Sequence, residues 1–145
     1  MAFDLAAVKT ALVNQVQTAM PAGRTLNAYP QDPGEVRSCP SVATKPGEPY
    51  VLYHLTFGDN ALCAVNLILE VRVQAREIDA QIAIDAYCSA GTGQTASIRA
   101  AVEADRTLGG VVGDCCVMAV HVPEEPDESG DLVARFDVEI HQSRS

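Results

Sequence analysis

Residues 61–75, with the sequence ALCAVNLILEVRVQA, constrain the fold of this chain more than any other stretch. Apolar side chains recur at every second position, and the charged residues Glu70 and Arg72 stand between them. The alternating apolar set consists of Cys63, Val65, Leu67, Leu69, Val71, Val73 and Ala75. Ile68 is an exception on the polar side. A period of two is typical of a β-strand with one buried face.

The length of this strand predicts that it extends beyond the body of the domain. Fifteen extended residues span roughly 45 Å at about 3.3 Å per residue, which exceeds the diameter of a small domain. We therefore expect the end of the strand to project and to offer edge hydrogen bonds to a neighbour. The alternative is a bulge midway along the strand, near Asn66, that bends it back onto the domain.

The rest of the chain supplies the partners of this strand. Residues 50–57 have the aromatic and β-branched character of a strand, and the turn sequence Gly58-Asp59-Asn60 joins them to it in a predicted hairpin. Alternation also predicts strands over 115–122 and 131–141. Apolar residues at helical spacing predict helices over 5–19, 77–88 and 97–105. We predict an α+β fold: one domain over 1–145, with a mainly antiparallel four-stranded sheet and helices packed on one face.

Two segments fall outside this regular pattern. Five of the eight prolines lie between Pro30 and Pro49, so residues 24–49 are predicted to form an extended Pro-rich arm with a short strand at 24–29. Residues 123–131, PEEPDESGD, contain five acidic residues and no basic one. We expect them to form an acidic, solvated hairpin tip, because the residue spacing of a calcium-binding EF-hand loop is missing.

The net charge and the hydropathy of the chain argue against DNA and membranes as binding partners. The net charge is −9, with 19 acidic and 10 basic residues, and a protein that clamps DNA needs the opposite balance. No apolar run approaches the roughly 18 residues of a membrane span, and the first residues, MAFDLAAVKT, lack the pattern of a signal peptide. We expect a soluble protein made in the cytoplasm, with no membrane partner.

The sequence shows no pattern of catalytic chemistry. The three histidines are far apart, and neither a nucleophile elbow nor a Gly-rich phosphate loop is present. The five cysteines have no metal-binding spacing and are predicted to be free thiols. We predict no enzyme activity, no catalytic residue, no metal and no cofactor. A small thiol enzyme that uses Cys88, Cys115 or Cys116 stays open as an alternative, as does a plain soluble binding domain.

Several segments, taken in order, resemble the tail terminator proteins of long-tailed bacteriophages. They are the strand PYVLYHLTFG, the strand NLILEVRVQA with the helix DAQIAIDAYCS after it, and the stretch SIRAAVEADRTLGGVVGDCCV. The resemblance implies a structural virion protein in a ring, six copies in this family, at the head-proximal end of the tail. Such a ring ends polymerisation of the tail tube and joins it to the head-side connector, while genomic DNA passes through the channel. Head-closure and connector proteins of the phage neck share similar folds and are the alternative.

A ring of this kind points to two groups of residues. Polar side chains at strand positions suit contacts between subunits; the candidates are Arg72, Gln74, Arg76, Arg135, Asp137 and Glu139. An acidic surface suits a channel that passes DNA without gripping it. The candidates for the channel or its rim are Glu124, Glu125, Asp127, Glu128 and Asp131.

Overall fold

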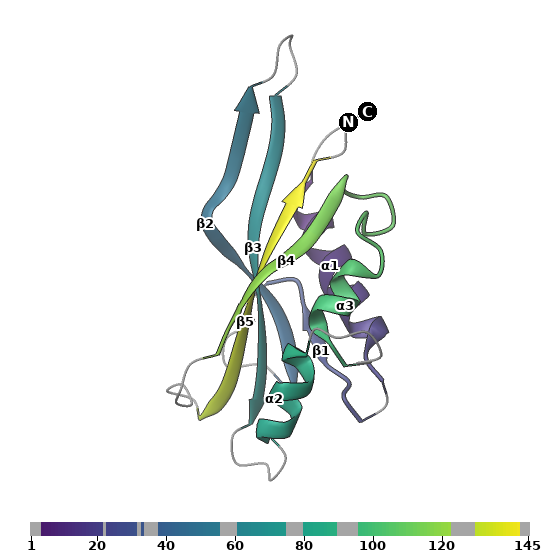
Figure 1. Cartoon of the computed structure of the whole chain (residues 1–145), viewed down its shortest axis with the longest axis vertical. Coiled ribbons are helices and arrows are strands. Elements are labelled where there is room, and N and C mark those ends of the chain that lie inside the picture. The colour runs from purple at the N-terminus through teal and green to yellow at the C-terminus, as the bar shows by residue number, and fades with distance from the viewer. Residues whose placement is uncertain are drawn as a thin grey trace.

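A computed structural model describes residues 4–21, 23–31, 33, 38–55, 61–74, 80–89, 96–122 and 130–142. Within these residues the chain forms three helices and five strands (Figure 1). The helices are α1 (Leu5–Ala19), α2 (Ala80–Cys88) and α3 (Ile98–Glu103). The strands are β1 (Asn27–Tyr29), β2 (Ser41–Leu55), β3 (Ala61–Gln74), β4 (Asp114–His121) and β5 (Asp131–His141). None of the described helices is long and apolar enough to cross a membrane.

The strands form one mixed sheet in the order β1-β2-β3-β5-β4. The predicted α+β class and the strand over 131–141 are confirmed. The predicted number of four strands is wrong, because β1 adds a fifth strand. β1 runs parallel to β2, which makes the sheet mixed, while the other three pairings are antiparallel. β1 pairs with β2 only from Ser41 to Ala43, so a short parallel strand covers one end of β2. No other described strand pairs with the rest of that edge.

The predicted Pro-rich arm over 24–49 is also corrected, since residues 41–49 belong to β2. Proline was expected to exclude a strand inside the sheet. It is tolerated here because Pro46 and Pro49 lie where no strand pairs with the outer edge of β2, among the residues that the structure describes. The register also shifts between Pro46, which pairs with Leu67, and Val51, which pairs with Val65. Four residues of β2, including Pro49, thus lie opposite the single residue Asn66 in a bulge, and Pro46 immediately precedes it.

The core lies between one face of the sheet and the helices. Val65, Leu67, Leu69, Val71 and Val73 of β3 are buried, as the alternation predicted. They share one cluster with buried residues of all three helices, which confirms that the helices pack on one face of the sheet. The buried helix residues in that cluster are Val8, Leu12, Val13, Val16, Ala80, Ala83, Ile84, Tyr87, Ile98, Ala101 and Val102.

Two side-chain placements differ from the sequence pattern. The apolar spacing within residues 77–88 predicts a packed position for Ile82, which is instead 62% exposed. The helix begins at Ala80 and packs through Ala80, Ala83, Ile84 and Tyr87. On β4 the alternation placed Cys116, Met118, Val120 and Val122 on one face. A bulge between Val117 and Ala119 interrupts that alternation. Consequently Cys116 pairs with Glu139, whereas Val120 pairs with the buried Phe136.

Local polar contacts fix the helix ends next to the core. The Asp4 carboxylate accepts hydrogen bonds from the backbone N–H groups of Ala6 and Ala7, which makes it the N-cap of α1. Ser97 caps α3 in the same way. After α3 the chain turns with positive φ at Leu108, Gly109 and Gly110, a conformation that glycine adopts without strain. This turn leads directly into β4.

Candidate functional site: the helix-free face and the open edges of the sheet

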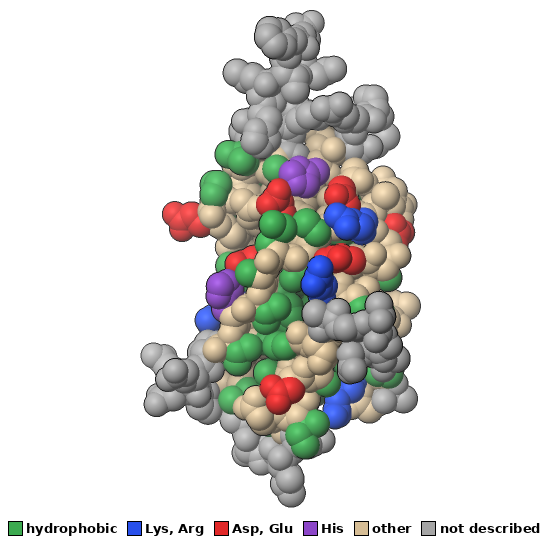
Figure 2. All heavy atoms as spheres, viewed as in Figure 1, with side chains coloured by type: hydrophobic (Ala, Val, Ile, Leu, Met, Phe, Trp, Pro, Cys, Tyr) green, Lys and Arg blue, Asp and Glu red, His purple; other side chains and the backbone are tan. Residues whose placement is uncertain are grey.

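The predicted interface residues Arg72, Arg135, Asp137 and Glu139 lie on the face of the sheet opposite the helices. Cross-strand pairing places them there, because directly paired residues point to the same face. Glu70 pairs with Arg135, Ile68 with Asp137 and Asn66 with Glu139. Figure 2 shows acidic, basic and histidine side chains lying among apolar ones, with no continuous patch of one charge on the viewed face.

A buried carboxylate organises the charges on this face. Glu70 is 1% exposed, although the sequence placed it on the polar side of β3. One of its oxygens lies 2.6 Å from Arg72 Nε, and the other lies 3.1 Å from Lys45 Nζ and 3.4 Å from Arg135 Nε. Burial by itself raises the pKa of Glu70, but hydrogen bonds from Arg72 and Lys45 outweigh it and hold the pKa below its ordinary value. The group is therefore an anion held by three cations.

This arrangement changes the role of two predicted interface residues. Arg72 is 8% exposed and bonds Glu70 within the same chain, and it also lies 3.6 Å from the carboxylate of Asp131. Arg135 keeps a more exposed side chain beside Glu70. Sequence reasoning missed Glu70 and Lys45 as the centre of this network. The sequence does contain one sign of this network: Glu70 and Arg72 are two residues apart on one predicted strand, so their side chains lie next to each other on the same face.

The remaining predicted residues divide by exposure. His121 Nε2 lies 2.9 Å from a carboxylate oxygen of Asp137, and His141 Nε2 lies 2.7 Å from one of Glu139. All four side chains are partly exposed to solvent. Gln74 ends β3 opposite Asp131 and is half-buried. Arg76 and the acidic residues Glu124, Glu125, Asp127 and Glu128 lie outside the described residues. Asp131 pairs with Arg72 rather than standing alone on an acidic rim.

The β2–β3 hairpin extends past the other strands. β3 pairs with β2 from Ala61 onward, but with β5 only from Ala64 onward, where its partner is His141. The ends of β2 and β3 therefore form a two-stranded ribbon beyond the sheet, visible at the top of Figure 1. The expected projection is present, and so is the bulge, which lies in β2 opposite Asn66. Two-stranded ribbons are marginally stable in water unless a third strand or a packed surface supports them.

The edge of the sheet at β4 is half covered. The backbone N–H of Val117 donates to Glu103 Oε2 of α3 at 3.1 Å, so a side chain occupies the edge there. Beyond that point Met118, Val120 and Val122 are 61%, 38% and 46% exposed. Within the described part of the chain, no strand pairs with β4 on the side away from β5. This stretch is an apolar, open sheet edge.

The thiols and histidines do not form a catalytic arrangement among the described residues. Burial raises the pKa of Cys115 to about 12, and its Sγ lies 3.7 Å from the carbonyl oxygen of Val102. Burial also raises the pKa of Cys88 and Cys116, so these thiols are poor nucleophiles near neutral pH. In the same part of the chain, no group of three His, Cys, Asp or Glu side chains could hold a metal ion.

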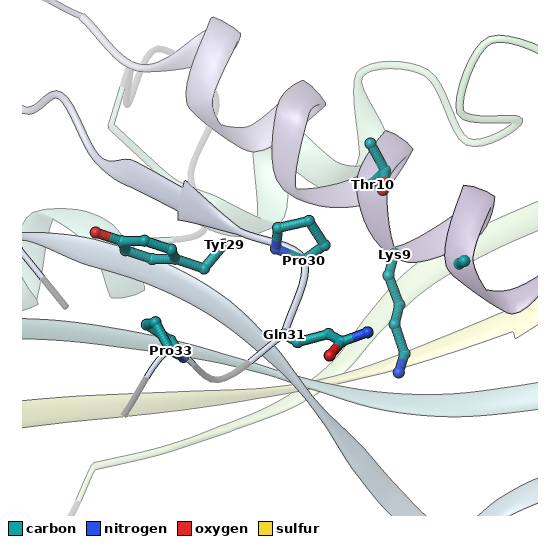
Figure 3. Close-up of a pocket in the computed structure, with 7 residues that line it drawn as sticks. Lys9, Thr10, Tyr29, Pro30, Gln31 and Pro33 are labelled. Carbon is teal, nitrogen blue, oxygen red and sulfur yellow. The ribbon is translucent and has the colours of Figure 1, made fainter. Parts of the chain in front are cut away.

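One cavity of about 460 Å³ lies between α1 and the segment after β1 (Figure 3). Lys9 and Thr10 line it from α1, and Tyr29 and Gln31 line it from the opposite side, with Gln31 extending toward Lys9. The Lys9 ammonium also lies 5.4 Å from the centre of the Tyr50 ring. The residues described around this cavity offer no carboxylate, thiol or imidazole for acid–base chemistry.

No protein-family model matches this chain, and the search of curated proteins finds no match either.

Proposed function

We propose that this protein is a structural subunit that assembles through its sheet edges into a ring, as a tail terminator at the head-proximal end of a phage tail. The observation that carries the proposal is the two-stranded end of the β2–β3 hairpin, which extends past β5 with no third strand beside it in the described structure. A neighbouring copy would supply the missing support. In this role the ring ends the tail tube and joins it to the head-side connector.

Charge supports the same role. The chain carries a net charge of −9, which suits a ring whose channel passes DNA without holding it. The basic side chains Lys45, Arg72 and Arg135 on the helix-free face are all bonded to Glu70, which leaves them poorly placed to grip phosphates. We propose that acidic groups face the channel or its rim. A ring structure with every acidic cluster on its outer wall would contradict this part of the proposal.

The proposed role of the protein is assembly and not catalysis. The thiols of Cys88, Cys115 and Cys116 all have raised pKa values, which is the opposite of an activated nucleophile. A fast reaction of any of these thiols with iodoacetamide at neutral pH would favour the alternative of a thiol enzyme.

Two measurements test the proposal. Sedimentation velocity and negative-stain electron microscopy of the purified protein should show closed rings, whereas a monomer at all concentrations would contradict it. In phage particles that lack the protein, tails longer than normal identify a terminator. Normal tails beside unjoined heads would instead identify a head-closure or connector protein of the phage neck.

A further inference from the structure

The two outer edges of the sheet are each covered over one part and open over another. At β4, the carboxylate of Glu103 accepts a hydrogen bond from the backbone N–H of Val117. The strand continues past this point, and no described strand pairs with it on the side away from β5. At β2, β1 pairs with Ser41–Ala43, and no other described strand pairs with the outer side of residues 50–55. The prolines at 46 and 49 lack backbone N–H groups, so they interrupt the edge between the covered and the open part.

The open part of β4 has a bulge at Met118, but it has none of the charged or proline residues that commonly protect a sheet edge. Exposed edges normally carry Lys, Pro or an inward-pointing charge that prevents pairing with other chains. The sequence from Met118 to Val122, MAVHV, has no Lys, Arg or Pro and exposes three apolar side chains. On β2, Leu52 is likewise 40% exposed. Each segment therefore exposes apolar side chains on a strand whose outer side no other described strand pairs with.

We propose that residues 118–121 of β4 in one copy pair with residues 50–55 of β2 in the next copy, so that the sheet continues from protomer to protomer. The occupant of each edge is a second copy of this chain, because each protomer carries both halves of the contact. The contact joins two different surfaces and is heterologous, the type that closes into a ring or continues as a filament. This inference rests on the proposed function and names the surfaces that build the ring.

The offset along the strand direction between the two open segments is compatible with a closed ring of copies. Val51 lies on the same row of the sheet as Val65, Ile140 and Cys115. Pairing residues 50–55 with residues 118–121 therefore shifts the next copy along the strands by about five residues, roughly 17 Å. Each copy contributes the four strands β2, β3, β5 and β4 to the continued sheet, which is about 19 Å across. The two lengths give a strand tilt of about 40°, within the range of closed barrels.

Three variants test the pairing. Met118→Lys with Val120→Lys places two charges on the β4 edge, and Leu52→Lys places one on the β2 edge. Ile82→Lys is the matched control, because Ile82 is as exposed as Met118 but lies on α2, away from both edges. We expect each edge variant to weaken self-association in sedimentation velocity by about tenfold or more. We expect the control to assemble as the wild type does, and circular dichroism to show the native fold in all three.

A mixing experiment separates a heterologous contact from a symmetric one. The β4 variant keeps a functional β2 edge, and Leu52→Lys keeps a functional β4 edge. An equimolar mixture should therefore form a 1:1 dimer that grows no further, while neither variant alone dimerises. If Leu52→Lys alone forms dimers and the mixture forms no additional complex, β4 pairs with itself and the proposal is overturned.

The outcomes also distinguish this inference from the function on which it rests. Rings that persist in both edge variants would retain the ring function and overturn this pairing. A wild-type protein that stays monomeric at all concentrations would overturn both. Benzoylphenylalanine at position 120 gives an independent check: after irradiation, mass spectrometry should find cross-links to residues 50–55 of another copy, and cross-links confined to other segments would contradict the pairing.

Discussion

The side-chain amide of Asn66 donates a hydrogen bond to the carbonyl oxygen of Pro49 at 2.8 Å. The one residue of β3 that lies opposite the bulge of β2 thus donates to a residue within the bulge. The same contact explains why β2 can contain two prolines and still pair with β3 on both sides of the bulge. The bulge in turn separates the covered and open parts of this sheet edge.

The close fit of this bulge predicts the effect of Gly47→Ala. A Cβ atom at position 47 would lie 2.7 Å from the backbone oxygen of Asn66 and 2.9 Å from its carbonyl carbon. Backbone atoms cannot move aside as a flexible side chain can, so we expect a loss of about 1–3 kcal/mol in the free energy of unfolding. Urea denaturation measures it. Glu48→Ala, in the same bulge but exposed, is the control and should change stability little. Equal stability of the two variants would contradict the predicted clash.

Removal of the charge on Glu70 should destabilise the fold. Glu70→Gln keeps the shape of the side chain but leaves Arg72, Lys45 and Arg135 without their shared anion. Arg72 is buried, so we expect a loss of about 3 kcal/mol in the free energy of unfolding. Glu139→Gln is the matched control, because it makes the same change on the same sheet face at a half-exposed pair with His141. It should cost less than about 1 kcal/mol.

Glu70 should also shape the dependence of stability on pH. Its pKa lies below the ordinary value of 4.5 in the folded protein. The native state therefore holds the proton less tightly than the unfolded chain does, and the stability that this carboxylate contributes is fully present above about pH 4.5 and lost as pH falls through the lowered pKa. We expect wild-type stability to fall more steeply than that of Glu70→Gln between about pH 5 and pH 3. Parallel curves over this range would show that the pKa is not lowered.

The buried thiol of Cys115 should resist modification. With a pKa of about 12 and no exposed surface, it forms little thiolate at pH 8. In a Cys116→Ser variant, which removes the neighbouring thiol, we expect mass spectrometry to find no iodoacetamide adduct at Cys115 until the protein is unfolded in urea. Rapid labelling of the folded variant would place Cys115 on an accessible surface and would favour the thiol-enzyme alternative.

The sequence by itself determined the features that depend on local periodicity and capping. The alternation in residues 131–141 matches β5 at both ends, and Asp4 and Ser97 cap the helices that they precede. A side chain's face on a strand follows from the period of two, and an N-cap depends on the next three residues. The predicted α+β class follows from the order of these elements.

The tertiary structure decided the features that depend on which strands become neighbours. It placed residues 41–49 in β2, because no described strand pairs with the outer edge of the proline-containing part of that strand. It buried Glu70, because Lys45 and Arg135 come from two different strands on either side of β3. It also shifted the alternation of β4 at Met118, since a bulge depends on pairing with β5. Edges, bulges and buried ion networks are properties of strand pairs, so the periodicity of one segment does not contain them.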